Sequence, residues 1–172
     1  MITLVLGGAR SGKSRHAEGL AAASAGERIY IATAENIDTE MAGRIAKHRE
    51  QRGPGWRTVE APYALEQALL AADGPERFLL VECITLWINN LLYVGADVEE
   101  RVAALCTALQ TLKADVVLVS NEAGLGIVPD NVLARAFRDA AGRANQVIAA
   151  AAGEVVFIVA GLPLVLKTSR PG

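Results

Sequence analysis

The stretch that most constrains this chain is a glycine-rich loop of the form G-x-x-x-x-G-K-S near its start. Its residues are Gly7, Gly8, Ala9, Arg10, Ser11, Gly12, Lys13 and Ser14. An apolar run, residues 2–6, precedes the loop, and a helix-like stretch, residues 14–23, follows it. In this strand–loop–helix context the pattern predicts a polyphosphate site, because glycines let backbone amides at a helix N-terminus approach an anion closely.

Two side chains of this loop have predicted roles. We expect Lys13 to reach the outer phosphates of the ligand and the Ser14 hydroxyl to ligate Mg²⁺. The alternative is a glycine-rich turn with an incidental Lys-Ser pair, which the flanking strand and helix patterns disfavour.

Composition limits the number of domains and the kinds of partner. The chain has 172 residues, of which 52% are hydrophobic, so it can form one domain with a real core but not two ordinary domains. We expect a single catalytic domain over residues 1–167 and a C-terminal tail over residues 168–172. The net charge of -2 gives no general attraction to nucleic acid or to a membrane surface.

Cysteine usage and hydropathy indicate a cytoplasmic protein. Cys83 and Cys106 are the two cysteines, and free thiols in a reducing compartment are the expected state. The N-terminus enters a strand pattern directly, without the features of a signal peptide. No apolar run approaches the roughly 20 residues that a membrane span needs, so we expect no stable membrane insertion.

Apolar runs alternate with amphipathic stretches along the chain. The strand candidates are residues 2–6, 28–33, 57–60, 78–83, 116–120 and 154–159. Several are continuously apolar, which is typical of strands buried on both faces. The alternation predicts an α/β fold with a mostly parallel sheet, helices on both faces, and ligands at the carboxyl ends of the strands.

Polar residues at strand ends are therefore candidates for the site. Thr33, Ala34 and Glu35 follow the second strand and should lie beside the nucleotide, although an ordinary strand-to-helix loop explains them equally well. Glu82 ends the fourth strand, where phosphate-loop proteins place a metal-side acid that is usually aspartate. The longer Glu82 could hold Mg²⁺ through water, and the alternative is a carboxylate that faces solvent.

A basic run over residues 44–52 contains His48, one of two histidines in the chain. A histidine on a charged helix is usually only solvated, but this segment follows a strand whose end should face the phosphates. Arginines around a histidine near a triphosphate suit either anion clamping or nucleophilic attack on phosphorus. We expect His16, just behind the phosphate loop, to be structural.

For three later segments the sequence gives less specific predictions. Residues 85–92 are too apolar for an exposed helix; core is the default, and a substrate pocket or subunit interface is the alternative. Residues 121–129 could form a mobile substrate loop. Asp130 is the expected cap of the long helix that follows, which we expect to end at Gly153.

Together these patterns strongly resemble the bifunctional adenosylcobinamide kinase / adenosylcobinamide-phosphate guanylyltransferase family. The motifs that carry the resemblance are Gly7 to Ser14, residues 31–34, Arg44 to Arg52, Glu82 to Thr85, residues 120–129 and residues 137–146. The phosphate loop alone is unspecific, but this ordered set is highly specific and covers nearly the whole chain.

The resemblance implies two reactions in cobalamin biosynthesis. ATP or GTP phosphorylates adenosylcobinamide, and GMP is then transferred from GTP to that phosphate through a covalent GMP-histidine, which falls on His48. It implies Mg²⁺, a RecA-like sheet and a homotrimer with substrate near a subunit interface. The implied nucleotide contacts are the phosphate loop, Thr33, Ala34, Glu35, Arg49, Glu50, Gln51, Arg52, Glu60 and Glu82.

Three alternative functions have to be weighed against this resemblance. A single-activity small-molecule kinase with a phosphate loop would need no nucleophilic histidine. A GTP-binding switch usually carries an N-K-x-D motif, which this sequence lacks, and its one D-x-x-G match, Asp139 to Gly142, lies in a predicted helix. A phosphate-binding assembly ATPase would explain the loop but not the rest of the ordered set.

Overall fold

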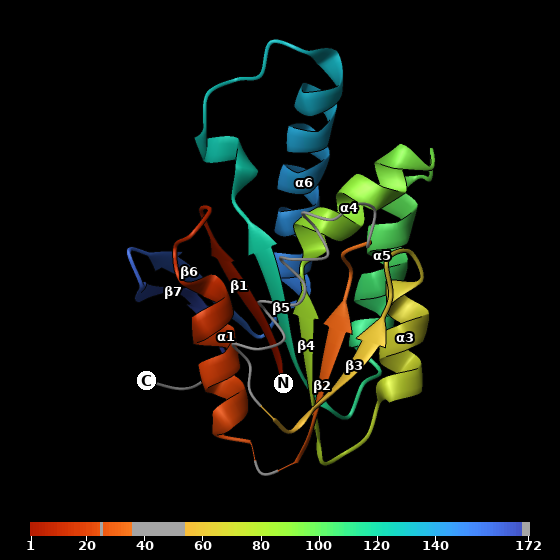
Figure 1. Cartoon of the computed structure of the whole chain (residues 1–172), viewed down its shortest axis with the longest axis vertical. Helices are drawn as coiled ribbons and strands as arrows, with labels where there is room; N and C mark the ends of the chain where they lie inside the picture. Colours follow the sequence, from red (N-terminus) through yellow and green to blue (C-terminus); the bar gives the residue numbers. More distant parts are fainter. Residues whose placement is uncertain (25, 36–53, 170–172) are drawn as a thin grey trace.

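The structure, a computed structural model, describes residues 1–24, 26–35 and 54–169 (Figure 1). Its strands are β1 (Ile2–Gly7), β2 (Glu27–Ala32), β3 (Trp56–Glu60), β4 (Arg77–Glu82), β5 (Asp115–Asn121), β6 (Glu154–Val159) and β7 (Leu162–Thr168). Its helices are α1 (Lys13–Ala22), α3 (Leu65–Ala72), α4 (Ile84–Tyr93), α5 (Val98–Leu109) and α6 (Val132–Ala151), with a 3-10 turn η1 (Ala123–Leu125). The predicted site residues His48, Arg49, Glu50, Gln51 and Arg52 lie outside the described residues.

The strands of the described residues form one sheet in the order β3-β2-β4-β5-β1-β6-β7. All neighbouring strands are parallel except β6 and β7, which are antiparallel. This arrangement confirms the predicted α/β class and the mostly parallel sheet. The strand that enters the phosphate loop, β1, lies between β5 and β6, so side chains from the end of β5 lie next to the loop.

Helices cover both faces of this sheet, as predicted. On one face α1 buries Ala17 and Ala21 against alternate residues of the strands, among them Val119 of β5. On the other face α3, α4, α5 and α6 share a larger core in which Trp87 is fully buried. Figure 1 shows α1 apart from these four helices. The central strands are continuously apolar because both of their faces are covered.

Side-chain caps fix the starts of two long helices. Asp97 accepts a hydrogen bond from the Glu100 backbone amide at the start of α5, which satisfies an amide that has no partner within the helix. Asn131 does the same for α6 by accepting from the Ala134 amide. Asn131, and not the predicted Asp130, is therefore the cap of α6. Within the described residues, no helix is long and apolar enough to cross a membrane.

The C-terminal part of the chain contains a strand that the sequence patterns did not predict. Strand β7 runs antiparallel to β6, and Thr168 pairs with Glu154. Thr168, which we expected to begin the tail, is therefore part of the sheet. The hairpin turn between β6 and β7, at Ala160 and Gly161, lies against the phosphate loop, as the contacts below show.

Candidate nucleotide site

The phosphate loop has a backbone that requires glycine at two positions. A Cβ on Gly7 would lie 2.6 Å from the Ile158 carbonyl oxygen and 2.7 Å from the Ser11 Oγ, which leaves no room for a side chain. Gly12 caps α1 with a φ of 100°, in the left-handed region that residues with a Cβ rarely adopt. The lack of space at Gly7 and the left-handed backbone at Gly12 explain why the chain has glycine at both positions.

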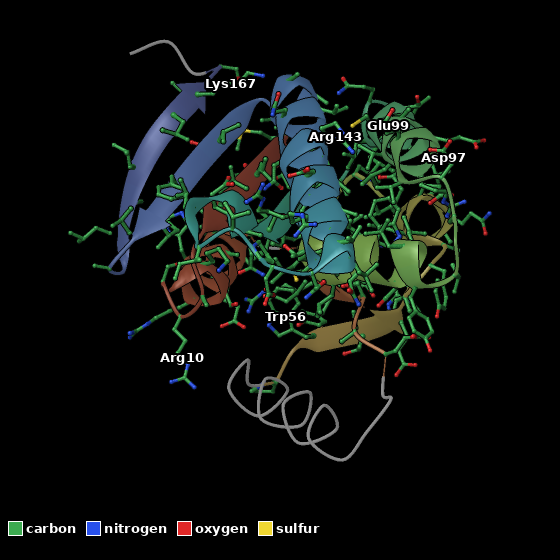
Figure 2. All side chains as sticks on the ribbon, turned by 90° about the horizontal axis from the view of Figure 1, so that it is seen from above. Arg10, Trp56, Asp97, Glu99, Arg143 and Lys167 are labelled. Atoms are coloured by element: carbon green, nitrogen blue, oxygen red, sulfur yellow. The ribbon has the colours of Figure 1, made fainter. Side chains whose placement is uncertain are left out.

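Arg10 is the one residue of the loop other than glycine that has a positive φ, at 56°. Its side chain is exposed, and Figure 2 shows it extending away from the ribbon. The loop thus presents a guanidinium to solvent beside the phosphate site, where it can meet an anionic group of a ligand.

Two neighbouring segments hold the loop by backbone hydrogen bonds. The Gly161 amide in the β6–β7 turn donates to the Ser11 carbonyl at 2.8 Å. The Glu122 amide, just after β5, donates to the Gly7 carbonyl at 3.0 Å. The phosphate loop is therefore fixed from both sides of β1, which preorganises its amides for an anion.

Lys13, the first residue of α1, is buried, and its side chain reaches back to the start of the loop. Its side chain is 7% exposed, and its Nζ donates to the Gly8 carbonyl oxygen at 2.7 Å. Burial lowers the pKa of Lys13 below its usual range, and the nearby Glu82 carboxylate opposes that effect. A buried ammonium without full charge compensation is suited to bind a phosphate oxygen.

Ser14 and Glu82 come together although they are far apart in the sequence. The Ser14 Oγ donates to the Glu82 Oε1 at 3.0 Å, which joins the start of α1 to the end of β4. A hydroxyl and a carboxylate at this distance fit Mg²⁺, which commonly takes one or two protein oxygens, with phosphate oxygens and water as the remaining ligands. The pair therefore has the chemistry of a magnesium site for a bound triphosphate.

Thr33 lies at the end of β2 with its side chain fully buried. Its hydroxyl donates to the Cys83 carbonyl at 2.8 Å and accepts from the Cys83 amide at 2.7 Å. The hydroxyl therefore joins the ends of β2 and β4, and the Thr33 amide adds to this junction by donating to the Glu82 carbonyl at 3.1 Å. The following residues, Ala34 and Glu35, are half-buried, and the Tyr63 hydroxyl donates to the Glu35 Oε1 at 2.7 Å.

Glu60 lies farther from the phosphate loop than the other described candidates. It ends β3, the edge strand, where it is exposed and pairs with Ala32. Four strand steps separate β3 from β1, which corresponds to roughly 19 Å at the usual strand spacing. Glu60 can therefore meet only the end of a nucleotide that points away from the phosphates.

The sequence patterns did not identify Asn90, a buried polar side chain that supports the end of β2. Asn90 on α4 is 8% exposed and donates to the carbonyls of Thr33 at 2.8 Å and Pro62 at 3.0 Å. The signal available in the sequence was a paired asparagine, Asn89 and Asn90, inside an otherwise apolar stretch. A polar side chain in such a position has to find buried partners, which here are backbone carbonyls.

With this geometry in view, comparison with known proteins identifies the family. The family model for cobinamide kinase / cobinamide phosphate guanyltransferase matches residues 3–166. This chain belongs to that family. It is thus an enzyme of a family that combines a kinase with a nucleotidyltransferase.

Relatives within the family are similar over their whole length. The chain is 45% identical to the bifunctional adenosylcobalamin biosynthesis protein CobU of Escherichia coli, with 97% of this chain and 100% of that protein covered. It is 49% identical to the bifunctional adenosylcobalamin biosynthesis protein CobP of Pseudomonas aeruginosa, with 97% and 98% covered.

A solved structure supports the fold class independently of these relatives. The flagellar accessory protein FlaH from Methanocaldococcus jannaschii matches with a TM-score of 0.51 at 14% identity, covering 97% of this chain and 78% of that chain. At this identity the likeness concerns the fold alone. It agrees with the mostly parallel α/β sheet described above.

Proposed function

We propose that this chain phosphorylates adenosylcobinamide and then transfers GMP from GTP to the new phosphate, giving adenosylcobinamide-GDP and pyrophosphate in cobalamin biosynthesis. The observation that carries the proposal is the meeting of Lys13, Ser14 and Glu82 around the phosphate loop of a chain of this family. The names of the full-length relatives support the assignment to adenosylcobalamin biosynthesis.

In the kinase step the γ-phosphoryl group of ATP or GTP moves to the hydroxyl of adenosylcobinamide. The loop amides and Lys13 bind the phosphates and stabilise the charge that develops on them. Ser14 and Glu82 would hold Mg²⁺, which neutralises phosphate charge when bound. The exposed Arg10 side chain would bind an anionic oxygen at the solvent side of the loop.

In the second step we propose His48 as the nucleophile. The neutral imidazole nitrogen forms a bond to the α-phosphorus of GTP while the bond to the bridging oxygen breaks and pyrophosphate leaves. An oxygen of adenosylcobinamide phosphate then attacks the same phosphorus and releases the histidine. After incubation with GTP and Mg²⁺, the intact mass should rise by one acid-labile GMP in the native chain and not in His48→Ala. An adduct that persists in His48→Ala would contradict this assignment.

We further propose that the nucleotide extends from the phosphate loop across the ends of β5, β4 and β2 toward β3. Its contacts would include Thr33, Ala34 and Glu35 at the end of β2, the segment Arg49, Glu50, Gln51 and Arg52, and Glu60. The position of Glu60 on the edge strand supports a contact with the nucleoside end. A Glu60→Ala variant should bind GTP more weakly while binding inorganic triphosphate unchanged, and equal affinities for GTP would exclude the contact.

The experiment that tests the function follows the corrinoid product. The protein is incubated with adenosylcobinamide, GTP and Mg²⁺, and the corrinoids are separated and weighed by mass spectrometry. Native protein should give the phosphate and then the GDP derivative, whereas Lys13→Ala should give neither. A phosphate that never progresses to the GDP derivative would favour the single-activity kinase, and GTP hydrolysis without any corrinoid product would favour a switch.

A homotrimer is part of the same proposal. Strand β7 supports it, because Leu162, Leu164 and Leu166 are 72%, 56% and 57% exposed on an edge of the sheet. Exposed apolar edge strands usually pair or become covered in the native assembly. The mass of the protein in solution tests this part of the proposal.

A further inference from the structure

Three adjacent strands end at the phosphate loop, and the middle one carries a side chain with no assigned role. The order β4-β5-β1 places the end of β5 between Glu82 and the loop. In the sheet register Asn121 lies opposite Gly7, and Glu82 lies opposite Val119. Asn121 is thus the residue of β5 that stands level with the first glycine of the loop.

The alternation of side chains along β5 shows which face Asn121 occupies. Val117 and Val119 pack in the same cluster as Ala17 and Ala21 of α1. Ser120 points to the opposite face, where it donates to Asn145 of α6. Because strand side chains alternate, Asn121 lies on the face of α1, with the loop on one side and Glu82 on the other.

A closed ring of hydrogen bonds fixes the backbone of Asn121. Its amide donates to the Thr85 Oγ1 at 2.7 Å, and its carbonyl accepts from the Asn145 Nδ2 at 3.1 Å. Ser120 donates to the Asn145 Oδ1 at 2.7 Å, so the Thr85 hydroxyl, 3.2 Å from the Ser120 hydroxyl, supplies the remaining hydrogen. Thr85, Ser120 and Asn145 are buried, which makes this network costly to distort.

The Asn121 side chain itself is left available by this network. It is half-buried, and within the described residues its carboxamide makes no hydrogen bond. We propose that the Asn121 carboxamide binds the terminal phosphate of the bound nucleoside triphosphate and is a catalytic residue of the phosphoryl-transfer step. This inference rests on the proposed function and adds a residue that the phosphate-loop pattern does not contain.

The chemistry assigns Asn121 to one of the two reactions. In the kinase step the bond from the γ-phosphorus to the β–γ bridging oxygen breaks, and the substrate hydroxyl oxygen bonds to phosphorus. The hydroxyl proton passes to water, and the nucleoside diphosphate leaves. The Asn121 Nδ2 donates to a non-bridging γ-oxygen throughout and takes no proton. In GMP transfer the reacting atom is the α-phosphorus, and the γ-phosphate is the far end of the departing pyrophosphate, so a donor at the γ-phosphate has a smaller effect there.

The test compares both reactions in Asn121→Ala and Asn121→Asp. We expect Asn121→Ala to lower kcat for adenosylcobinamide phosphorylation about 100-fold, as removal of one preorganised donor does in other enzymes. GMP transfer to adenosylcobinamide phosphate supplied directly should stay within about threefold, because the donor is remote from the reacting bond. Asn121→Asp keeps the shape but adds a charge that repels phosphate, so its phosphorylation rate should fall at least as far.

Gln110→Ala is the matched control. Gln110 also carries a carboxamide, but it caps the end of α5 and donates to the Ala151 carbonyl, and both residues precede the amino ends of their strands, β5 and β6, away from the phosphate loop. Both of its reaction rates should match the native protein. A native phosphorylation rate in Asn121→Ala, or equal losses in both reactions, would overturn the role of Asn121. Absence of both products from the native protein would instead overturn the proposed function.

Discussion

A single buried ammonium, that of Lys13, makes the phosphate site sensitive to alkaline pH. Because burial lowers its pKa, the ammonium loses its proton at a lower pH than an exposed lysine does. Below that pKa the charged group binds phosphate, and above it the neutral amine does not.

We therefore predict that GTP affinity declines on the alkaline side before the pH reaches 10.5, the ordinary lysine value. Titration of GTP binding against pH by calorimetry measures this decline. Lys13→Ala, which lacks the group, should bind weakly and show no such alkaline decline. An affinity in the native protein that stays constant up to the ordinary lysine pKa would contradict the assignment.

Glu82 provides a second prediction for one side chain. Glu82→Gln keeps the shape beside Ser14 but removes the negative charge that would attract Mg²⁺. We expect the Mg²⁺-dependent transfer rates to fall about 100-fold or more, by analogy with removal of one electrostatic group from an active site. GTP binding measured without Mg²⁺ should persist. The control is Glu76→Gln, an exposed residue before β4, which should leave the rates unchanged.

Among the elements, helix α4 stabilises the fold through a polar side chain as well as through its apolar core residues. Asn90 joins this helix to the end of β2 and to the segment before α3. Asn90→Ala leaves two carbonyls without their donor, so the free energy of unfolding should fall by about 1–3 kcal/mol. Asn89→Ala, an exposed neighbour on the same helix, should change it by less than about 0.5 kcal/mol. Denaturant titration of both variants gives the comparison, and equal effects would contradict this role of Asn90.

The elements also show where sequence patterns succeed and where they fail. The buried parallel strands were predictable because apolar runs such as residues 78–81 have both faces covered. Strand β7 was not predictable, because Pro163 interrupts its pattern and its side chains are exposed. Its sequence therefore shows no alternation of buried and exposed positions. The cap of α6 was misassigned by one residue, because Asp130 and Asn131 are both good caps and only backbone geometry separates them.

The candidate site was predictable to the extent that it follows from topology. Strand-end reasoning placed Glu82 near Ser14, and the two are hydrogen-bonded in the structure. The ring around Asn121 was not predictable, because Thr85, Ser120 and Asn145 come from three distant segments that only the folded chain brings together. The role of the Thr33 hydroxyl as a link to Cys83 was hidden for the same reason.

At the scale of the whole molecule, the proposed trimer can be tested through strand β7. Sedimentation should give three times the chain mass of 18.1 kDa for the native protein. Leu164→Asp places a charge on the exposed apolar strand and should lower that mass, whereas Leu70→Asp, on the half-exposed surface of α3, should not. A native monomer would contradict the trimer, and a trimer unaffected by Leu164→Asp would exclude β7 as its interface.

The central claim, that this chain passes a nucleotide from GTP to a corrinoid, is tested most directly by a pulse and chase. The protein is loaded with GTP labelled at the α-phosphorus, freed of unbound nucleotide, and then given adenosylcobinamide phosphate. Before the chase, we predict that the label stays attached to the unmutated protein after denaturation and is absent from denatured His48→Ala. During the chase, the label should move to the corrinoid. Label that never attaches to the protein, or that stays on it when the corrinoid is added, would contradict the account.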